Sequence, residues 1–259
     1  MNILVKNLSY KYSKNNYVLN DVSFNIAEGN IAIILGPNGV GKSTLLKCID
    51  DILKYKEGTI YIDNKDLHQL KANERARTIA FVKQYPDFGD VSVFDAILFG
   101  RTPYIYGEVS KEDKELVVEI IHKLHLEKIA LANVNEISGG ERQIVAIARA
   151  LAQKPKIILF DEPTSNLDIK NQENIIQLIK YLSINEKVTI LVTMHDINTA
   201  MNLGNYFILI KGGKIFKEGD EGILNKENIK SVYDVNVNLV EINKKKHIVL
   251  EEKENEKND

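Results

Sequence analysis

The sequence predicts an α/β fold with an antiparallel β subdomain at its N-terminus and an inserted helical subdomain. A short β-branched run at residues 31–35 is followed by a glycine-rich loop and then by apolar residues at helical spacing. This pattern predicts a buried parallel strand, a loop and a helix. Residues 2–9 and 17–27 alternate apolar and polar side chains, which is typical of antiparallel strands. From Pro86 onward, helical periodicity interrupts the alternation of strands and helices.

The composition is that of an ordinary globular chain. Its 259 residues are 44% hydrophobic and 27% charged, enough for one large domain or two small ones. The formal net charge of −2 does not favour a general nucleic-acid binder, so we expect no nucleic-acid partner. Cys48 is the only cysteine, which excludes an internal disulfide and favours a reducing compartment. No apolar run is long enough to span a membrane, and residues 1–6 lack the layout of a signal peptide.

Tyr10 and Tyr12 fall between the two N-terminal strands, where we expect a polar loop. An aromatic ring at this point can stack on a nucleotide base. It can equally be a half-buried side chain at the end of a strand. Spacing alone leaves both interpretations open.

The loop after the first buried strand has the pattern G-x-x-x-x-G-K-S of a phosphate-binding loop. Its residues are Gly36, Pro37, Asn38, Gly39, Val40, Gly41, Lys42, Ser43 and Thr44. The glycines allow a tight turn close to a polyphosphate, and the N–H groups at a helix start attract an anion. Lys42 can reach the terminal phosphates, and the Ser43 hydroxyl can hold Mg²⁺. The sequence therefore predicts binding of a nucleoside triphosphate.

Two more strands are predicted at residues 58–63 and 78–82. The second ends close to Gln84. From the end of a core strand, a glutamine can reach a metal-bound water or a phosphate. A surface amide is the ordinary alternative.

Helical spacing then marks the block that begins at Pro86. Apolar residues share one face at 93–98 and again at 116–124, the second set after a start signal at 110–113. Residues 100–107 lie between these two helical segments, and we expect them to be a loop with exposed aromatic side chains.

Ser138, Gly139 and Gly140 precede the next apolar-periodic helix. A serine and two glycines at a helix start can form a second anion-binding nest. The alternative is an ordinary N-cap with a flexible approach.

Residues 156–162 predict a buried strand that ends in two acids. Asp161 at the strand end can hold Mg²⁺ through water. Glu162, one residue later, points elsewhere and can orient or deprotonate an attacking water. The alternative is a solvated acidic strand end.

A turn at residues 165–168, closed by Asp168, caps a helix that we expect to end near Leu182. A core strand follows at 188–193, and His195 lies just beyond it, where ligands collect in open α/β sheets. The other histidines match no metal-site spacing and are expected at the surface or in packing: His68, His122, His125 and His247.

The C-terminal part predicts a hairpin at 207–210 and 214–217 and a short helix at 225–233. A second hairpin is expected at 237–242 and 247–251, around a turn of three lysines at 244–246. Residues 251–259 are poor in apolar side chains and predict a frayed tail.

These motifs together resemble the ATP-binding-cassette (ABC) ATPases, in that family's order and over nearly the whole chain. The resemblance covers the following: residues 36–44 with Walker A, 136–143 with the signature, 157–162 with Walker B and its catalytic glutamate, Gln84 with the Q-loop, 165–168 with the D-loop, His195 with the switch histidine, and Tyr12 with the adenine-stacking aromatic.

Residues 93–104, 141–143 and 194–198 are similar to the ATPases of importers for iron–siderophores, haem and cobalamin. Three positions depart from the family: Ile137 for leucine, Asn166 for alanine and Asn205 for an acid. None of them belongs to the phosphate or metal groups, so we expect an active enzyme. Nothing is carried over beyond about Asp234.

The resemblance implies a P-loop NTPase (RecA-like) core within a single ABC ATPase domain at 1–259. We expect residues 1–85 and 155–235 to form the nucleotide-binding core with the β subdomain. Residues 86–154 would form the helical subdomain with the signature, and 236–259 the C-terminal hairpin and tail.

The resemblance also implies the roles of the site residues. ATP would lie between Lys42 and Ser43 of one copy and Ser138–Gly140 of a second, in a head-to-tail dimer that also brings Asp168 to the nucleotide. Mg²⁺ would be held by Ser43, Gln84 and, through water, Asp161. Glu162 would polarise the attacking water, with His195 and Gln84 completing the catalytic set.

The implied partners are polytopic permease subunits and, indirectly, a substrate-binding protein, with the chain at the cytoplasmic face of the membrane. A metal chelate is the expected cargo. An alternative is a soluble ABC-type ATPase, such as one for iron–sulfur cluster assembly. A small-molecule P-loop kinase is a third class, which would not need Ser138–Gly140.

Overall fold

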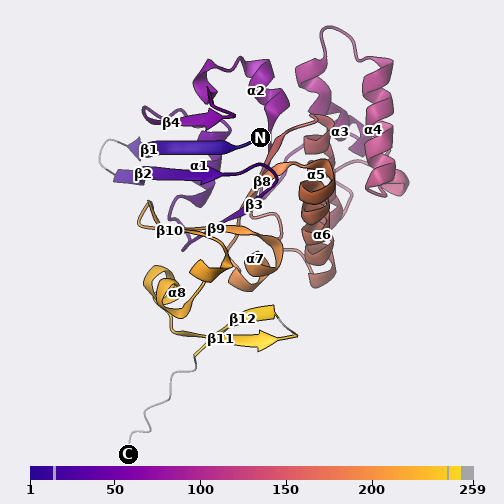
Figure 1. The fold of residues 1–259 in the computed structure, drawn as a ribbon. Helices are drawn as coiled ribbons and strands as arrows, with labels where there is room; N and C mark the ends of the chain where they lie inside the picture. The colour runs from indigo at the N-terminus through magenta and orange to yellow at the C-terminus, as the bar shows by residue number, and fades with distance from the viewer. Residues whose placement is uncertain (14–15, 244, 252–259) are drawn as a thin grey trace, which may run out of the picture.

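The computed structural model describes residues 1–13, 16–243 and 245–251. The N-terminal sheet lies at the upper left of Figure 1 and a group of helices at the right. The central sheet lies between them, and the C-terminal hairpin lies at the bottom. Among the described residues, we find no helix with the length and apolarity needed to cross a membrane.

The central sheet confirms the predicted α/β fold. Its strand order is β10-β9-β3-β8-β7-β6, parallel except for β10. The strands are β3 (Ile31–Leu35), β6 (Ile79–Val82), β7 (Ile157–Asp161), β8 (Thr189–Thr193), β9 (Tyr206–Lys211) and β10 (Lys214–Gly219). Every residue of β3, β7 and β8 is buried, which explains their continuous apolar runs. Since these three strands are parallel neighbours, the segments that follow them meet at one edge of the sheet.

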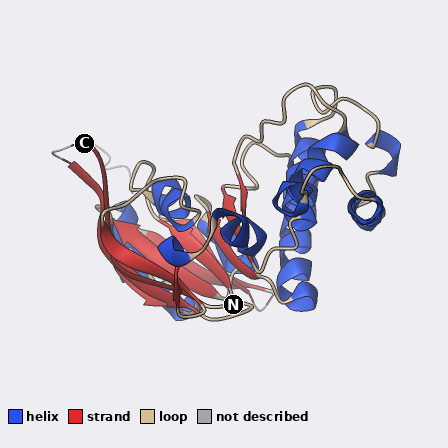
Figure 2. Cartoon of the chain, turned by 90° about the horizontal axis from the view of Figure 1, so that it is seen from above, coloured by secondary structure: helices blue, strands red, loops and turns tan. Residues whose placement is uncertain are grey.

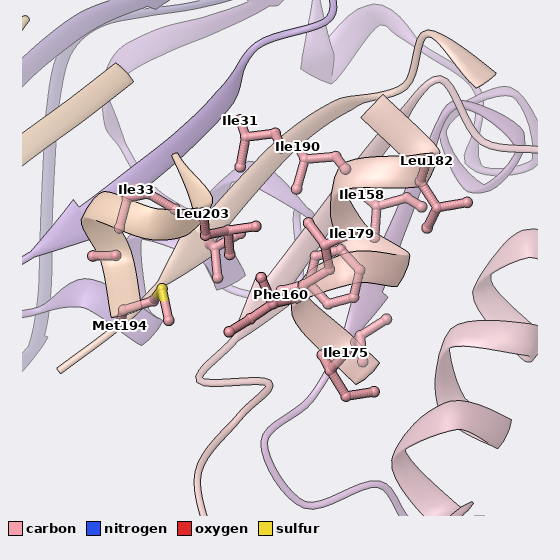
Figure 3. Close-up of a cluster of buried hydrophobic side chains, with 14 of the residues drawn as sticks. Ile31, Ile33, Ile158, Phe160, Ile175, Ile179, Leu182, Ile190, Met194 and Leu203 are labelled. Atoms are coloured by element: carbon pink, nitrogen blue, oxygen red, sulfur yellow. The ribbon is translucent and has the colours of Figure 1, made fainter. Parts of the chain in front are cut away.

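Alternate side chains of the central strands enter two different cores. On one face, Ile33, Ile158, Phe160 and Ile190 pack against helices α6 (Ile169–Glu186) and α7 (Ile197–Leu203), as Figure 3 shows. On the other face, the core includes Ile34, Leu159 and Leu191 together with α1 (Lys42–Ile49) and the N-terminal sheet. The phosphate loop therefore joins a strand and a helix that are both fixed by packing.

The N-terminal sheet has the order β2-β1-β4-β5. Its strands are β1 (Ile3–Ser13), β2 (Asn16–Ile26), β4 (Glu57–Ile62) and β5 (Lys65–Asp66). The antiparallel pairing of β1 and β2 continues past Tyr10, which lies opposite Leu19. The prediction of a polar loop around Tyr10 and Tyr12 was therefore wrong, because these residues are part of β1.

The helices of the inserted block share a hydrophobic core of their own, which includes Val93, Ile97, Val117 and Val145. Figure 2 shows this group of helices beside the strands. The elements are α3 (Val93–Leu98), the 3₁₀ helix η2 (Phe99–Tyr104), α4 (Lys111–Lys123), the 3₁₀ helix η3 (Glu127–Ile129) and α5 (Gly139–Ala152).

The segment 100–107 is more ordered than the expected exposed loop. Most of η2 falls in it, and both Gly100 and Arg101 are buried. A Cβ atom at Gly100 would lie 2.1 Å from the carbonyl oxygen of Arg149, so this turn packs directly on α5. Tyr106 is exposed as expected.

The remaining elements connect these layers. They are the 3₁₀ helix η1 (Leu67–Gln69), α2 (Ala72–Thr78), the 3₁₀ helix η4 (Glu221–Ile223), α8 (Lys226–Tyr233), β11 (Val237–Ile242) and β12 (Lys245–Leu250). Strands β11 and β12 pair with each other, and α7 contacts β12. Helix α6 runs four residues beyond the expected end at Leu182. Lys244 and residues 252–259, which hold part of the predicted lysine turn and most of the predicted tail, lie outside the described residues.

Candidate nucleotide-binding and hydrolysis site

The phosphate loop has a backbone that only glycine fits at two points. Gly36 has a φ of +154°, and a Cβ there would lie 2.4 Å from the carbonyl oxygen of Ile210. Gly41, the N-cap of α1, has a φ of +109°, and its Cβ would lie 2.8 Å from the carbonyl oxygen of Val18. No side chain caps this helix start. Its first N–H groups are therefore left for a ligand, as anion binding at a helix N-terminus requires.

Lys42 is buried and folds back over the loop. Its Nζ donates to the carbonyl oxygens of Gly36 at 2.8 Å and Pro37 at 3.2 Å. Burial lowers the pKa of Lys42, and the carboxylates of Glu162 and Asp161 oppose that shift. The ammonium group thus lies near both acids that end the predicted strand.

Asp161 connects three elements at the edge of the central sheet. Its Oδ1 accepts hydrogen bonds from Ser43 Oγ at 2.7 Å and from Thr193 Oγ1 at 2.7 Å. Thr193 is a site residue that the sequence reasoning missed. A usable signal existed, because Thr193 is the polar end of an apolar strand and lies two residues before His195.

Glu162 has a φ of +46°, an unusual backbone conformation for a residue other than glycine. Its N–H donates to Thr193 Oγ1 at 2.9 Å. Its Oε2 accepts from Gln84 Nε2 at 3.1 Å and from Ser165 Oγ at 3.0 Å. His195 Nδ1 lies 3.6 Å from the same oxygen.

The three predicted catalytic residues, Glu162, Gln84 and His195, are thus together. Their contacts all go to Oε2 of Glu162, and Oε1 accepts no hydrogen bond among the described residues. One carboxylate oxygen is held in place while the other is left for a further partner.

Tyr12 lies next to the phosphate loop. The residue is 61% exposed, and its hydroxyl is 3.2 Å from Thr44 Oγ1, at the start of α1. Tyr10 meets it edge-on with 5.0 Å between ring centroids. The arrangement leaves an aromatic surface beside the loop, as base stacking would need.

Ser138 is the N-cap of α5, which was the alternative interpretation of this position. Its hydroxyl accepts from the N–H of Glu141, and the Glu141 carboxylate accepts from Ser138 in return. The hydrogen bonds from Ser138 lower the pKa of the Glu141 carboxyl, and the bond from the hydroxyl has a larger effect than the bond from the backbone N–H. Ser138 and Gly139 are exposed.

Residues Ser138–Gly140 begin α5 and are here called the signature turn. This turn packs against Asn171 at the start of α6. A Cβ at Gly140 would lie 2.6 Å from the Asn171 side chain. Asp168, the N-cap of α6, accepts from the N–H of Asn171 at 2.8 Å and from its Nδ2 at 2.9 Å. Gly140 and Asp168 therefore both lie against Asn171, a contact that the sequence did not predict.

The two predicted anion sites do not meet within the chain. In the part of the chain that the structure describes, no hydrogen bond or ion pair joins Ser138–Gly140 to Gly36–Thr44. Ser138–Gly140 lie instead at the start of α5, where Gly140 is next to Asn171 of α6.

The residues around the phosphate loop fit a magnesium nucleotide. The backbone of the loop is close-packed at Gly36 and Gly41, where a Cβ atom would clash. Ser43 and Asp161 present hard oxygen ligands 2.7 Å apart. Gln84, the third predicted metal ligand, contacts Glu162 in this structure, not Ser43 or Asp161.

Comparison with known proteins agrees with these motifs. Residues 19–165 match the family described as ABC transporter. The chain is 46% identical over 235 residues to an uncharacterized ABC transporter ATP-binding protein of Methanocaldococcus jannaschii, covering 91% of this chain and 92% of that protein. It is 36% identical over 235 residues to a probable iron chelatin transport ATP-binding protein of Helicobacter pylori, covering 89% and 92%.

Solved structures are similar over most of their length. An inward-facing metal-chelate type ABC transporter superposes with a TM-score of 0.84 at 29% identity, covering 97% of this chain and 98% of that one. A dimeric ATP-binding cassette in a post-hydrolysis state, bound to ADP and Pi, superposes with a TM-score of 0.73 at 35% identity, covering 84% and 98%. With the phosphate loop, the acid pair and the signature turn in one α/β chain, these matches show that the protein belongs to the ABC transporter family, as one of its ATP-binding ATPase subunits.

Proposed function

We propose that two copies of this chain bind ATP between them and hydrolyse it to drive the import of a metal chelate through a separate permease. The observation that carries the dimer is the separation of the two anion sites in one chain, described above. In a head-to-tail pair, the signature turn of one copy would complete the phosphate loop of the other. The dimeric form of the related cassette bound to ADP and Pi supports this arrangement.

Within each site the residues would divide the work between binding and chemistry. Gly36–Thr44 would bind the phosphates through backbone N–H groups, and Lys42 would neutralise their charge. Tyr12 would stack on adenine. Ser138–Gly140 and Asp168 would close the site from the second copy.

Glu162 would act as the base or orienting group for the attacking water. Its Oε2 is held by Gln84 and Ser165, so Oε1 can face a water molecule. His195, 3.6 Å from Oε2, would hold the γ-phosphate on the other side. Positioning and charge neutralisation provide most of the catalysis, because no covalent bond to the protein forms.

Mg²⁺, when bound, neutralises charge on the β- and γ-phosphate oxygens. Ser43 and Asp161 would hold it, the latter through water. Gln84 would join this set only if its side-chain oxygen faces the metal while its Nε2 keeps Glu162.

The proposed permease contact is a cleft between the core and the inserted block. A cavity of 440 Å³ is lined by Phe81 and Lys83 from the core and by Phe99 and Arg149 from the block. Ile52 and Phe99 at this cleft are 50% and 52% exposed, so the cleft offers apolar surface to a partner. A permease helix with an apolar face fits such a groove. The separate core of the helices supports our division at 85/86 and 154/155.

The metal-chelate cargo rests on the relatives. Their names include iron chelatin transport and petrobactin import, and the superposed transporter is of metal-chelate type. A phosphonate import protein is 32% identical, so an oxyanion is the second cargo class. The chain would sit as a peripheral subunit at the cytoplasmic face of the membrane, with a substrate-binding protein delivering cargo on the far side.

Reconstitution tests this function. The chain is tagged, purified with the polytopic membrane protein that accompanies it, and placed in liposomes with a radiolabelled ferric hydroxamate and its binding protein. We expect uptake that needs ATP and is lost in Lys42→Ala. Uptake of phosphonate in place of the chelate would correct the cargo. Recovery of only soluble iron–sulfur assembly proteins, with no uptake, would reject the importer.

A further inference from the structure

A side-chain hydrogen bond joins two loops of the hydrolysis site that are far apart in sequence. Asn166 Nδ2 donates to the Tyr85 hydroxyl at 3.0 Å, across 81 residues. Tyr85 directly follows Gln84, and Asn166 directly follows Ser165. Gln84 and Ser165 are the two residues that donate to Oε2 of Glu162. The two loops are therefore joined twice, once through the Glu162 carboxylate and once beside it.

The local conformation supports a built contact. Asn166 has a φ of +59°, which asparagine tolerates better than other residues with a side chain. Tyr85 is 69% exposed, so packing does little to hold its ring. Its position depends on the bond to Asn166. An alanine at this position would have no group that could make this bond.

We propose that Tyr85 and Asn166 form a staple that positions Glu162 for catalysis; this rests on the proposed function. The staple keeps the loop after β6 and the loop after β7 at a fixed separation. Gln84 and Ser165 then both reach Oε2 and fix the plane of the carboxylate. Oε1 is thereby aimed at the water. Neither staple residue hydrogen-bonds to Gly36–Thr44 in the described part of the chain, so we expect its loss to affect kcat more than KM for ATP.

The two partners can be removed without strain. Tyr85→Phe deletes only the hydroxyl. Asn166→Gly deletes the amide and suits a φ of +59° better than alanine would. Asn166→Asp is the conservative variant, because its carboxylate can accept a hydrogen bond from the Tyr85 hydroxyl. Tyr17→Phe is the matched control, since Tyr17 is exposed and its hydroxyl donates to Glu57 on the N-terminal sheet at 2.9 Å.

Steady-state ATP hydrolysis is the main readout. We expect kcat to fall about three- to tenfold in Tyr85→Phe and Asn166→Gly, the loss equivalent to one hydrogen bond, with KM for ATP within about twofold. The double variant should be no slower than the slower single variant, because both remove the same bond. Asn166→Asp should keep most of the activity, and Tyr17→Phe should match the wild type.

A kcat within about twofold of wild type in both single variants would contradict the proposal that the staple positions Glu162. An exposed hydrogen bond with only a structural role predicts that result. Multiplicative losses in the double variant, or a change confined to KM, would also overturn the proposal.

Hydrogen exchange separates this proposal from the proposed function. In the nucleotide-free protein, amides at 83–86 and 164–167 should exchange faster in Tyr85→Phe than in wild type and Tyr17→Phe. If the wild type hydrolyses no ATP, the proposed function fails, yet this exchange still tests the staple. Equal exchange in all three proteins would contradict it.

Discussion

Glu162 shows at the scale of one residue how the fold fixes a side chain of the proposed site. Its left-handed backbone carries a strain of about 1–3 kcal/mol. The N–H bond to Thr193 and the two donors on Oε2 hold it there. Strain of this kind is typical of functional positions, where packing over-determines the conformation.

Cys48 gives a prediction at the same scale. It is fully buried on α1, and burial, aided by the charge of Asp51, raises its pKa to about 12. Thiolate is the reactive form, so the native protein at pH 8 should not react with a disulfide reagent. One thiol should titrate after unfolding in guanidinium, because Cys48 is the only cysteine. Rapid reaction of the folded protein would show that α1 opens readily.

The sequence predicted several residues that the structure brings together, such as Gln84, Glu162 and His195, but it did not predict several of their contacts. Lys42, Ser43, Asp161 and Glu162 stand in short motifs whose spacing carries their chemistry. Asn166 and Tyr85 are 81 positions apart in the sequence, and no local pattern predicts that they form a hydrogen bond. Its existence depends on the order of strands in the sheet.

Elements differed in how well the sequence predicted them. The buried strands and α4 were clear, because continuous apolar runs and the capping signal at Ser110 are local. Helix α2 was missed because none of its residues is buried, so it has no apolar periodicity. Strand β1 was cut short because its polar end is paired with β2 without being buried.

The end of α1 carries a group that titrates near neutrality. Asp50 follows the helix, and burial raises its pKa to about 7 against the opposing charge of Arg75. The folded carboxyl keeps its proton between about pH 4 and 7 while the unfolded one loses it, so rising pH destabilises the fold in this range. Asp50→Asn should raise the melting temperature at pH 8 and leave it nearly unchanged at pH 4. An equal effect at both pH values would contradict the raised pKa.

The inserted block contains a buried ion pair. Arg101 Nε donates to Asp113 Oδ1 at 2.7 Å, and Arg101 also donates to the carbonyl oxygen of Ala152. These bonds join η2, α4 and α5. The hydrogen bond from Arg101, with those from Ser110, lowers the pKa of Asp113.

Arg101→Met should therefore lower the free energy of unfolding by about 3 kcal/mol at pH 7, because it leaves a buried carboxylate unpaired. Asp113 has a lowered folded pKa, so its stabilisation is complete above about pH 4 and is lost as the pH falls. The difference between variant and wild type should shrink below that pH in denaturant titrations. Lys111→Met, which breaks the exposed pair with Glu115, is the control and should change stability by less than about 1 kcal/mol. Equal losses in both variants would contradict the account.

At the scale of the whole molecule, the sheet order explains the composite site. Since β3, β7 and β8 are parallel neighbours, the phosphate loop, the acid pair and His195 come to one edge. The signature turn begins α5 and packs on α6 through Asn171 instead. In the proposed dimer, each of these two regions would form half of a composite site. The sequence predicted the half-sites, but the partner molecule follows only from the family and from this separation.

The most direct test is the mass of the Glu162→Gln variant in solution, measured by light scattering after size-exclusion chromatography. We predict a monomer without nucleotide and a dimer with ATP and Mg²⁺, since the variant binds ATP without consuming it. Adding Ser138→Arg should return the protein to a monomer. A variant that stays monomeric with ATP and hydrolyses it at the wild-type rate would contradict both the dimer and the role of Glu162.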